Sequence, residues 1–234
     1  MLTVPATGST NADLLTLARD GVIEDGVWLR AEQQTDGRGR QGRAWRSPPG
    51  NLYASTIVRI APHDPPAPGL ALVAAVALEE TIRALLPDPR GLRLKWPNDL
   101  LLDNAKLSGI LLERAGDHVV VGIGVNVAHH PALDERATTS LHAHHARIDA
   151  AELLERLAER FTAWLGTWRE RGIAPVAAQW SARAHPAGTI LSVRLPDGAV
   201  LEGAFGGLDA DGALLLSGRD GARHVVHAGD VFLV

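Results

Sequence analysis

The chain has 234 residues, of which 46% are hydrophobic and 21% charged, and its formal net charge is -4. This composition is typical of a soluble globular protein of one or two domains that can bury a substantial core. The absence of cysteine excludes disulfide frameworks, Cys-ligated zinc sites and thiol nucleophiles.

The first 184 residues mix helical and strand patterns. A polar cap, Ser9-Thr10-Asn11, precedes a short apolar helix that stops at Gly21. Two longer helices are expected over Gly69–Leu86 and over Asp149–Arg171, the second capped by Asp149. The remaining patterns predict strands over Val27–Glu32, Leu52–Ile60, Leu92–Trp96, Ile110–Glu113 and Val119–Val127, a loop over Thr35–Gly50 and a turn at Pro97-Asn98-Asp99.

The pattern changes after His185, where short strands alternate with turns. The expected strands are Thr189–Leu195, Val200–Phe205, Ala213–Leu216, Arg223–His227 and Val231–Val234, with turns at Pro196-Asp197-Gly198, Asp211-Gly212 and Asp220-Gly221. Such a series predicts a small β-barrel. We therefore expect an α+β catalytic domain over residues 1–184 and a barrel over residues 185–234. Because acids outnumber arginines in the second part, we expect no nucleic-acid partner.

Membrane contact and secretion are not expected. The longest apolar run, Leu70 to Leu78, is far shorter than the roughly 20 residues that span a bilayer. Residues 1–10 lack the basic and apolar regions of a secretory signal. These features favour a cytoplasmic protein.

The basic residues are unevenly divided between Arg and Lys. Of the 23 basic residues, two are Lys, Lys95 and Lys106, and five residues of the chain are Asn. A GC-rich genome explains this bias, because its codons favour Arg and Ala. The few remaining Lys and Asn are therefore the first places to look for function. Both Lys and all Asn except Asn104 lie in the motifs described next, in the Ser9-Thr10-Asn11 cap or at the strand entry Asn51-Leu52-Tyr53.

The strongest motif is the glycine- and arginine-rich loop from Asp36 to Trp45. Gly37, Gly39 and Gly42 have the spacing of the dinucleotide-binding pattern G-x-G-x-x-G. That pattern must open a helix, and here prolines and a strand follow, so we reject it. The loop also concentrates guanidinium groups suited to phosphate or carboxylate, from Arg38, Arg40, Arg43 and Arg46. It could fold over a polyanion, and the alternative is a solvated basic surface loop.

Three further motifs contain both Lys and two of the Asn residues. Lys95-Trp96-Pro97-Asn98-Asp99 stands at the end of a predicted strand, where ligand groups collect in open sheets. Its Lys and Asp could form a simple ion pair or could orient a phosphate and Mg²⁺. Lys106-Leu107-Ser108-Gly109-Ile110-Leu111 places the second Lys before a strand. Gly122-Ile123-Gly124-Val125-Asn126 puts two glycines in a strand, which marks a close approach by ligand or backbone.

Other site types find little support. Neither a P-loop nor a G-x-S-x-G nucleophile elbow is present. Neutral imidazoles can bind zinc or nickel. Five histidines lie close together in the sequence, but their spacing fits no known ligand pattern, so we expect no metal site there. They are His129, His130, His142, His144 and His145.

Taken together, the motifs resemble those of the biotin–protein ligases, in order and at similar spacing. The resemblance covers nearly the whole chain and continues through Gly172, Trp180 and Gly229-Asp230-Val231. It implies an α+β catalytic domain with a mixed β-sheet, similar to class II aminoacyl-tRNA synthetases, followed by an SH3-like barrel. Some members carry an N-terminal DNA-binding repressor domain. Because the catalytic match starts at Ser9, we expect a form without that domain.

The resemblance also implies a two-step reaction. Biotin's carboxylate attacks the α-phosphate of ATP, with Mg²⁺ assisting, and a lysine of a carrier domain then attacks biotinyl-5′-AMP. Lys106 and Arg40 would be catalytic. The implied biotin-binding residues are Ser9, Thr10, Asn11, Gln34, Arg38, Gly39, Arg40, Trp45 and Lys106. The implied nucleotide-binding residues are Arg38, Arg40, Arg43, Trp45, Lys95, Asn98, Asp99 and Asn126. The metal ligands stay unknown, with Asp99 a weak candidate.

Two rival functions stay open at this point. A lipoate–protein ligase would catalyse the same class of reaction, but its Arg-Arg-x-x-Gly-Gly-Gly type of segment is absent. A non-catalytic biotin-binding module would bind ligand without releasing pyrophosphate from ATP. For the ligase, the expected partner is the biotin carboxyl carrier domain of a carboxylase, and the expected state is a monomer or a homodimer.

Overall fold

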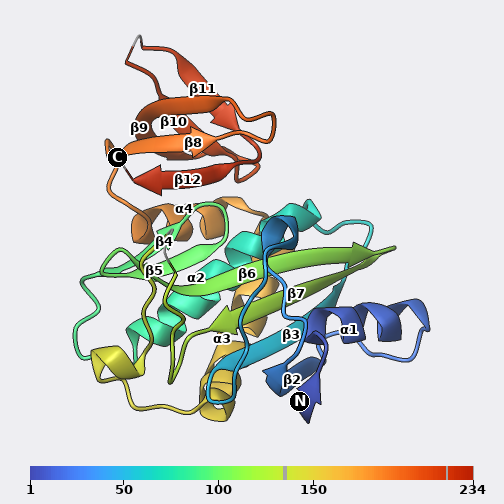
Figure 1. Ribbon diagram of the computed structural model, residues 1–234. Helices are drawn as coiled ribbons and strands as arrows, with labels where there is room; N and C mark the ends of the chain where they lie inside the picture. Colours follow the sequence, from blue (N-terminus) through green and yellow to red (C-terminus); the bar gives the residue numbers. More distant parts are fainter. Residues whose placement is uncertain (134–135, 220, 234) are drawn as a thin grey trace.

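The computed structural model describes residues 1–133, 136–219 and 221–233. Within these ranges the chain forms a seven-stranded sheet, a five-stranded sheet and four α-helices (Figure 1). The large sheet has the strand order β1-β2-β3-β7-β6-β5-β4. Its strands pair antiparallel except β1 with β2, which run parallel. The expected mixed α+β architecture is therefore confirmed.

The large sheet and its helices account for the first part of the chain. The strands are β1 (Leu2–Thr7), β2 (Trp28–Gln34), β3 (Leu52–Arg59), β4 (Leu92–Lys95), β5 (Asp99–Leu102), β6 (Ala105–Ala115) and β7 (His118–Val125). The helices are α1 (Thr10–Arg19), α2 (Leu70–Arg83), α3 (Ala150–Arg171) and α4 (Ala174–Arg183). Short 3-10 turns occupy η1 (Arg40–Gly42), η2 (Ala67–Gly69) and η3 (His142–His144).

Helices cover both faces of the large sheet, because successive strand residues point to opposite faces. On one face α1 packs Leu14 and Leu15 against Ile57 and Val120. On the other face α2 and α3 cover the main core. This core includes the residues of β3 and β7 that point away from α1, such as Val121. Full burial of one such side chain stabilises the fold by about 1.5–3 kcal/mol. Asp149 caps α3 as expected, accepting hydrogen bonds from the backbone of residues 151 and 152.

Several expected elements differ from the structure. The edge strand β1 and the helix α4 were not predicted, because neither carries a clear apolar period. The strand expected at Ile110–Glu113 starts earlier, at Ala105, and so contains Lys106. Asp99, expected in a turn, opens β5, because it lies opposite Lys95 in the β4–β5 hairpin. Trp96 falls outside β4 and precedes a cis proline.

The second sheet is antiparallel, with the order β11-β10-β9-β8-β12. Its strands are β8 (Ile190–Arg194), β9 (Val200–Leu208), β10 (Leu214–Ser217), β11 (Arg223–Val226) and β12 (Asp230–Leu233). The five expected strands are present with ends shifted by a few residues. Asp220 of an expected turn and Val234 of the last expected strand lie outside the described residues. Pairing between β11 and β12 is not seen among the described residues, so a closed SH3-like barrel stays a prediction, as does the boundary at residue 184.

The two sheets share one core. Side chains of the second sheet, such as Phe205 and Leu214, belong to the same buried cluster as α2 and Trp180 of α4. The indole of Trp96 also donates a hydrogen bond from Nε1 to the carbonyl oxygen of Gly212 at 3.2 Å. The second sheet is therefore held against the β4–β5 end of the large sheet (Figure 1). In the described ranges, no helix is long and apolar enough to cross a membrane.

Candidate active site

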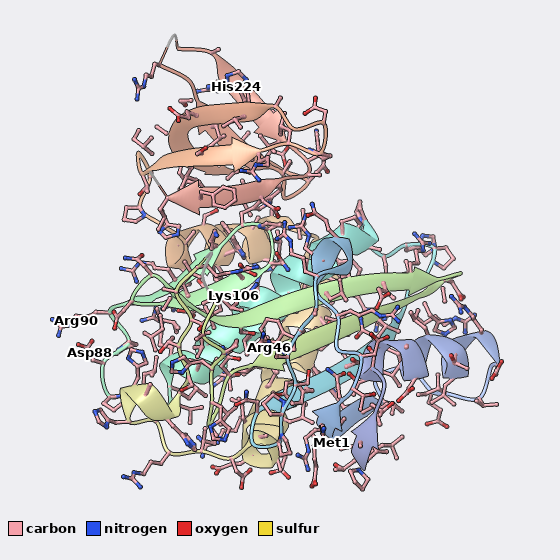
Figure 2. All side chains as sticks on the ribbon, viewed as in Figure 1. Met1, Arg46, Asp88, Arg90, Lys106 and His224 are labelled. Carbon is pink, nitrogen blue, oxygen red and sulfur yellow. The ribbon has the colours of Figure 1, made fainter. Side chains whose placement is uncertain are left out.

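A cavity of about 680 Å³ lies on the α1 face of the large sheet and extends to the second sheet. Figure 2 shows Lys106 near the middle of the molecule, whereas Asp88, Arg90 and His224 lie at its periphery. Every site residue expected from the sequence lines this cavity: Ser9, Thr10, Asn11, Gln34, Arg38, Gly39, Arg40, Arg43, Trp45, Lys95, Asn98, Asp99, Lys106 and Asn126. The tertiary structure thus gathers segments that are far apart in the chain.

Glycines form the floor of the cavity. Gly122 and Gly124 alternate with apolar residues in β7 and face α1, and Gly109 of β6 lies opposite Gly124. A Cβ on Gly122 would come within 2.2 Å of the Asn11 side chain, and one on Gly124 within 2.7 Å of Trp45. A close approach at these glycines is present as expected, but side chains of this chain make it, and not the ligand or backbone that was expected.

One end of the cavity, under the N-terminus of α1, is lined by hydroxyl and amide groups. Gln34 Oε1 accepts hydrogen bonds from the backbone N–H and the hydroxyl of Thr10, at 2.9 and 3.1 Å. The Ser55 hydroxyl donates to Asn11 Oδ1 at 2.6 Å, and Asn11 Nδ2 donates to Glu113 Oε2 at 2.8 Å. These bonds fix the side chains and leave a compact polar surface beside the apolar floor.

Ser9 stands where a helix cap is expected, but its side chain makes no capping hydrogen bond. Within the described ranges its hydroxyl makes no other hydrogen bond, and the residue, which is 6% exposed, lines the cavity. The Ser9 hydroxyl is therefore available for a hydrogen bond to a polar ligand in the cavity.

The glycine- and arginine-rich loop covers the cavity. Backbone hydrogen bonds close it on itself, from Gly39 N to Arg43 O at 2.7 Å and from Trp45 N to Gly37 O at 2.8 Å. A Cβ on Gly37 would lie 2.5 Å from the Trp45 carbonyl oxygen, so this tight return needs glycine. The loop in this structure is thus a defined lid segment with a short 3-10 turn at its tip.

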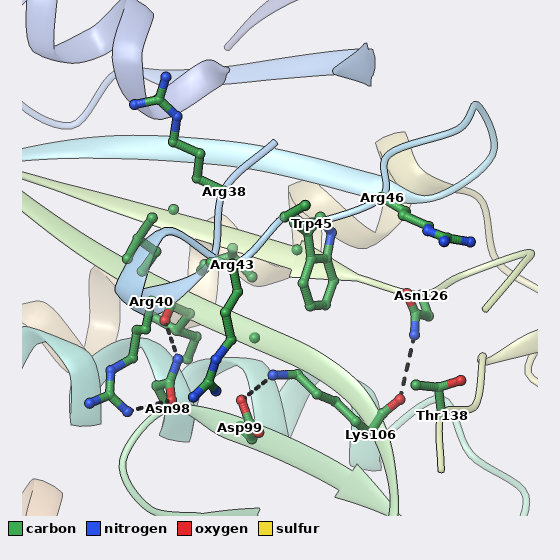
Figure 3. Close-up of a pocket in the computed structure, with 18 of the residues that line it drawn as sticks. Arg38, Arg40, Arg43, Trp45, Arg46, Asn98, Asp99, Lys106, Asn126 and Thr138 are labelled. Atoms are coloured by element: carbon green, nitrogen blue, oxygen red, sulfur yellow. Dashed lines mark hydrogen bonds and ion pairs between the residues drawn. The ribbon is translucent and has the colours of Figure 1, made fainter. Parts of the chain in front are cut away.

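The four arginines of the loop point in different directions. Figure 3 shows Arg43 reaching toward Asn98 and Asp99, whereas Arg38 and Arg46 point away from Lys106. Arg40 donates from Nη1 to Asn98 Oδ1 at 3.4 Å, and Arg38 forms an exposed pair with Asp36. Arg40 and Arg43 are therefore the guanidiniums that reach the centre of the cavity.

Lys106 and Asp99 form an ion pair at the centre of the cavity. Lys106 Nζ lies 2.5 Å from Asp99 Oδ1, and both side chains are almost buried, with 13% and 12% exposure. The ammonium also lies 5.5 Å from the centroid of the Trp45 ring, which packs over Gly109 and Gly124. A buried point charge beside an apolar wall is suited to bridging two anionic oxygens.

Lys95 lies opposite Asp99 in the β4–β5 register. Burial lowers the pKa of Lys95, Lys106 lowers it further, and Asp99 acts in the opposite direction. Among the described residues, Lys95 has no carboxylate within ion-pair distance. A mostly buried ammonium without a bonded anion favours the binding of an anionic ligand.

Two of the expected site residues mainly hold the backbone. Asn98 Nδ2 donates to Ile110 O at 2.7 Å, which ties the residue before β5 to β6. Asn126 Nδ2 donates to Thr139 O at 2.9 Å and to Lys106 O at 3.4 Å. Thr139 N in turn donates to Lys106 O, so Asn126 and this segment fix the backbone that carries Lys106.

Sequence reasoning missed several residues that shape the cavity. Ser55 is a polar residue within an apolar strand, and Glu113 is the partner of Asn11, so strand alternation could have indicated both. The segment with Arg136 and Thr138 lines the cavity near Lys106, and Asp230 and Phe232 reach it from the second sheet. Arg136, Thr138 and Phe232 carry no local signal, because only the packing of distant segments brings them to the cavity. Asp230 lies in the Gly229-Asp230-Val231 segment of the resemblance, which could have indicated it.

The histidine rings that follow β7 make separate contacts. Among the described residues, no cluster of three or more His, Asp or Glu side chains could hold a metal ion. His130 lies 3.1 Å from Ser140, His144 lies 2.9 Å from Thr139, and His142 lies 3.1 Å from a backbone carbonyl. These rings instead hold together the segment that follows β7.

Fold and cavity define an α+β protein with a cationic ligand site between two sheets. Residues 11–126 match the biotin/lipoate A/B protein ligase family, and residues 192–234 match the biotin protein ligase C-terminal domain. A biotin--[acetyl-CoA-carboxylase] ligase of Paracoccus denitrificans is 38% identical over 238 residues, covering 97% of each chain. One of Mycobacterium tuberculosis is 39% identical over 232 residues, covering 97% of this chain and 86% of that one.

A solved structure agrees with these relatives. A biotin protein ligase from Aquifex aeolicus in complex with biotin and ATP has a TM-score of 0.86 and 25% identity, covering 100% of this chain and 97% of that one. The chain therefore belongs to the biotin protein ligase family.

Proposed function

We propose that this protein is an ATP-dependent biotin–protein ligase, which activates biotin as biotinyl-5′-AMP and transfers it to a lysine of a carrier domain. The observation that carries the proposal is the placement of Lys106. Its ammonium lies within one cavity between the polar end at Thr10 and Gln34 and the cationic end at Lys95 and the second sheet. Such a cavity suits a neutral bicyclic ring at one end and a polyphosphate at the other.

In this proposal, biotin occupies the polar end. Its ureido group would be bound by Ser9, Thr10 and Gln34, and Trp45 would pack against its apolar body. Asn11 would contribute mainly through its fixed contacts with Ser55 and Glu113. The free hydroxyl of Ser9 and the apolar floor support this placement, because a small ligand site needs a few fixed polar groups on an apolar surface.

The first step would join the biotin carboxylate to the α-phosphate. A carboxylate oxygen forms a bond to phosphorus, the bond from phosphorus to the β-phosphate oxygen breaks, and pyrophosphate leaves. Both reactants are anionic, so the step needs neutralised charge and fixed positions more than acid–base chemistry. Lys106 would bridge the carboxylate and the α-phosphate, and Arg40 and Arg43 would approach the phosphates from the lid.

The rest of the nucleotide would lie along Lys95, Asn98 and Asp99, with Trp45 beside the adenine. Asn126 would act by holding the backbone of Lys106. Arg38 and Gly39 would close the lid over biotin, which keeps water from the mixed anhydride. In the second step an acceptor lysine would attack the carbonyl carbon of the adenylate, and AMP would leave with its oxygen.

The cavity fits Mg²⁺ that arrives with ATP rather than a resident metal. Mg²⁺ commonly binds through one or two carboxylates, substrate phosphates and water. Among the described lining residues, the carboxylates are Asp99 and Asp230, and each already pairs with a cation. Asp99 is the better placed, because it lies at the centre of the cavity and its hydrogen bond with Lys106 engages only Oδ1. When bound, the metal would neutralise phosphate charge.

The partner would be the biotin carboxyl carrier domain of a carboxylase. The names of the two bacterial relatives support this choice over a lipoate–protein ligase. We further propose a cytoplasmic enzyme that acts as a monomer or a homodimer, without a nucleic-acid or membrane partner.

The decisive experiment is the labelling of a purified carboxyl carrier domain with biotin. Labelling should require ATP and biotin, should release pyrophosphate, and should fail when the acceptor lysine of the carrier is replaced by arginine. A parallel reaction with lipoate separates the two ligase activities. Binding of biotin without pyrophosphate release would instead indicate a binding module and refute the proposal.

A further inference from the structure

The second sheet contributes its own residues to the cavity wall. Arg194 at the end of β8 and Asp230, Val231 and Phe232 of β12 line the cavity together with residues of the large sheet. In the β8–β12 register, Asp230 lies directly opposite Arg194. Opposite charges at such positions usually pair across the strands.

Asp230 does not pair with its cross-strand neighbour. Its carboxylate pairs with Arg43 of the lid and lies 4.0 Å from Arg40 Nη1. Arg40 also donates to the carbonyl oxygen of Gly229 at 3.4 Å. The lid is therefore tied to the second sheet through Asp230. In the described part of the chain, Arg194 is left without a carboxylate partner.

Phe232 holds Arg194 in place. The guanidinium carbon of Arg194 lies 5.6 Å from the centroid of the Phe232 ring, and Lys95 Nζ lies 5.8 Å from the same centroid. Phe232 is 46% exposed although its side chain is large and apolar. A phenyl ring attracts cations through its negative face, so one side chain can position both. The result is two cations without carboxylate partners beside a single aromatic ring.

These groups continue the row of charges that starts at Lys106. Lys106 pairs with Asp99, Asp99 lies opposite Lys95 in register, and Lys95 and Arg194 flank Phe232. A chain of phosphates with its α-phosphate at Lys106 and its far end toward the second sheet would meet Lys95 and then Arg194. Two adjacent cations repel each other, and a polyanion between them removes that repulsion.

We propose that Arg194, held by Phe232, binds the pyrophosphate that leaves when the adenylate forms. This inference rests on the proposed function, because it assigns the leaving group of that reaction. The second sheet would then take part in the chemistry by a direct contact with the β- and γ-phosphates. Its role in holding the lid through Asp230 would be separate.

The test compares Arg194→Ala with Arg219→Ala in the full-length protein. Arg219 lies in the turn after β10 of the same sheet, is highly exposed and does not line the cavity, so it is a matched control. Calorimetry measures binding of inorganic pyrophosphate to the free protein, and steady-state kinetics measure KM for ATP and for biotin. Loss of a charge-assisted hydrogen bond should weaken pyrophosphate binding at least about tenfold. The KM for ATP should rise, whereas the KM for biotin should change less than about twofold.

Further variants distinguish loss of the Arg194 contact from misfolding of the protein. Arg194→Gln keeps most of the side-chain length, and it should lose pyrophosphate affinity while its thermal unfolding midpoint matches that of the wild type. Phe232→Ala should weaken binding in part, and Phe232→Tyr should restore it. Wild-type pyrophosphate affinity in Arg194→Ala would overturn the inference, and so would an increase in the KM for biotin instead of ATP. Because the calorimetry needs no turnover, a wild-type protein that binds pyrophosphate through Arg194 but forms no adenylate would refute only the proposed function.

Discussion

Replacing Lys106 by glutamine tests the centre of the proposed site. Glutamine is one methylene shorter than lysine, stays polar and removes the charge, which lies 2.5 Å from Asp99 in a nearly buried pair. At an effective dielectric constant of 20, an ammonium and an oxyanion of unit charge 4 Å apart attract each other by about 4 kcal/mol. The loss of one donor to a developing oxyanion costs about 2.7–4 kcal/mol. Both energies predict that the rate of biotin-dependent pyrophosphate release falls roughly 100- to 1,000-fold in Lys106→Gln.

A second effect of Lys106→Gln must be separated from the first. Without its ammonium partner, the Asp99 carboxylate is left almost buried and uncompensated, which destabilises the local structure. The double variant Lys106→Gln with Asp99→Asn removes this charge. Pyrophosphate release is measured together with thermal unfolding and with calorimetric biotin binding. Recovery of activity in the double variant, or near-normal release in Lys106→Gln alone, would refute the assignment of Lys106 to the reaction.

Three further changes test the lid, the cavity floor and the pH dependence of stability. Arg40→Gly should loosen the lid and release biotinyl-5′-AMP, seen as labelling of unrelated protein lysines, and wild-type labelling would exclude a closing role for Arg40. Gly124→Ala should displace Trp45, because the added Cβ would lie 2.7 Å from its indole, and the KM for biotin should rise at least about tenfold, the scale of one lost packing contact. Gly166→Ala in α3 is the control, since its Cβ meets nothing within 4 Å, and an equal effect of both changes would contradict this account. Burial, together with two neighbouring cations, lowers the pKa of His185 below its ordinary value of 6.5. The unfolded chain therefore binds the proton more readily, so stability should fall as pH drops below 6.5. His185→Gln should show a smaller fall between urea midpoints at pH 7 and pH 5.

Much of the site follows from local sequence, because its chemistry needs rare residues at short spacing. The two Lys of the chain both line the cavity, as their scarcity suggested. Gly122 and Gly124 recur at the period of a strand, so the sequence alone places them on one face. The helix from Asp149 was also predictable, since its cap and its apolar stripe are local features.

Other features depend on segments that meet only after folding. The strand β1 lies at a sheet edge beside β2, and its register comes from that parallel pairing rather than from its own pattern. The role of Asn126 as a support for the Lys106 backbone depends on where Thr139 lies. The sequence alone does not show whether the Asn126 side chain hydrogen-bonds a ligand or a backbone carbonyl.

The contacts of the lid show most clearly which features follow from local sequence and which depend on tertiary packing. The sequence by itself determined that a loop with glycines and four arginines stands before a strand, because these are neighbours in the chain. Only the tertiary structure decided that Arg43 meets Asp230, which lies near the other end of the chain. Packing of the second sheet against the β4–β5 hairpin brings that carboxylate, Phe232 and Arg194 to the cavity. Such long-range contacts arise from the burial of a shared core, which no short sequence pattern records.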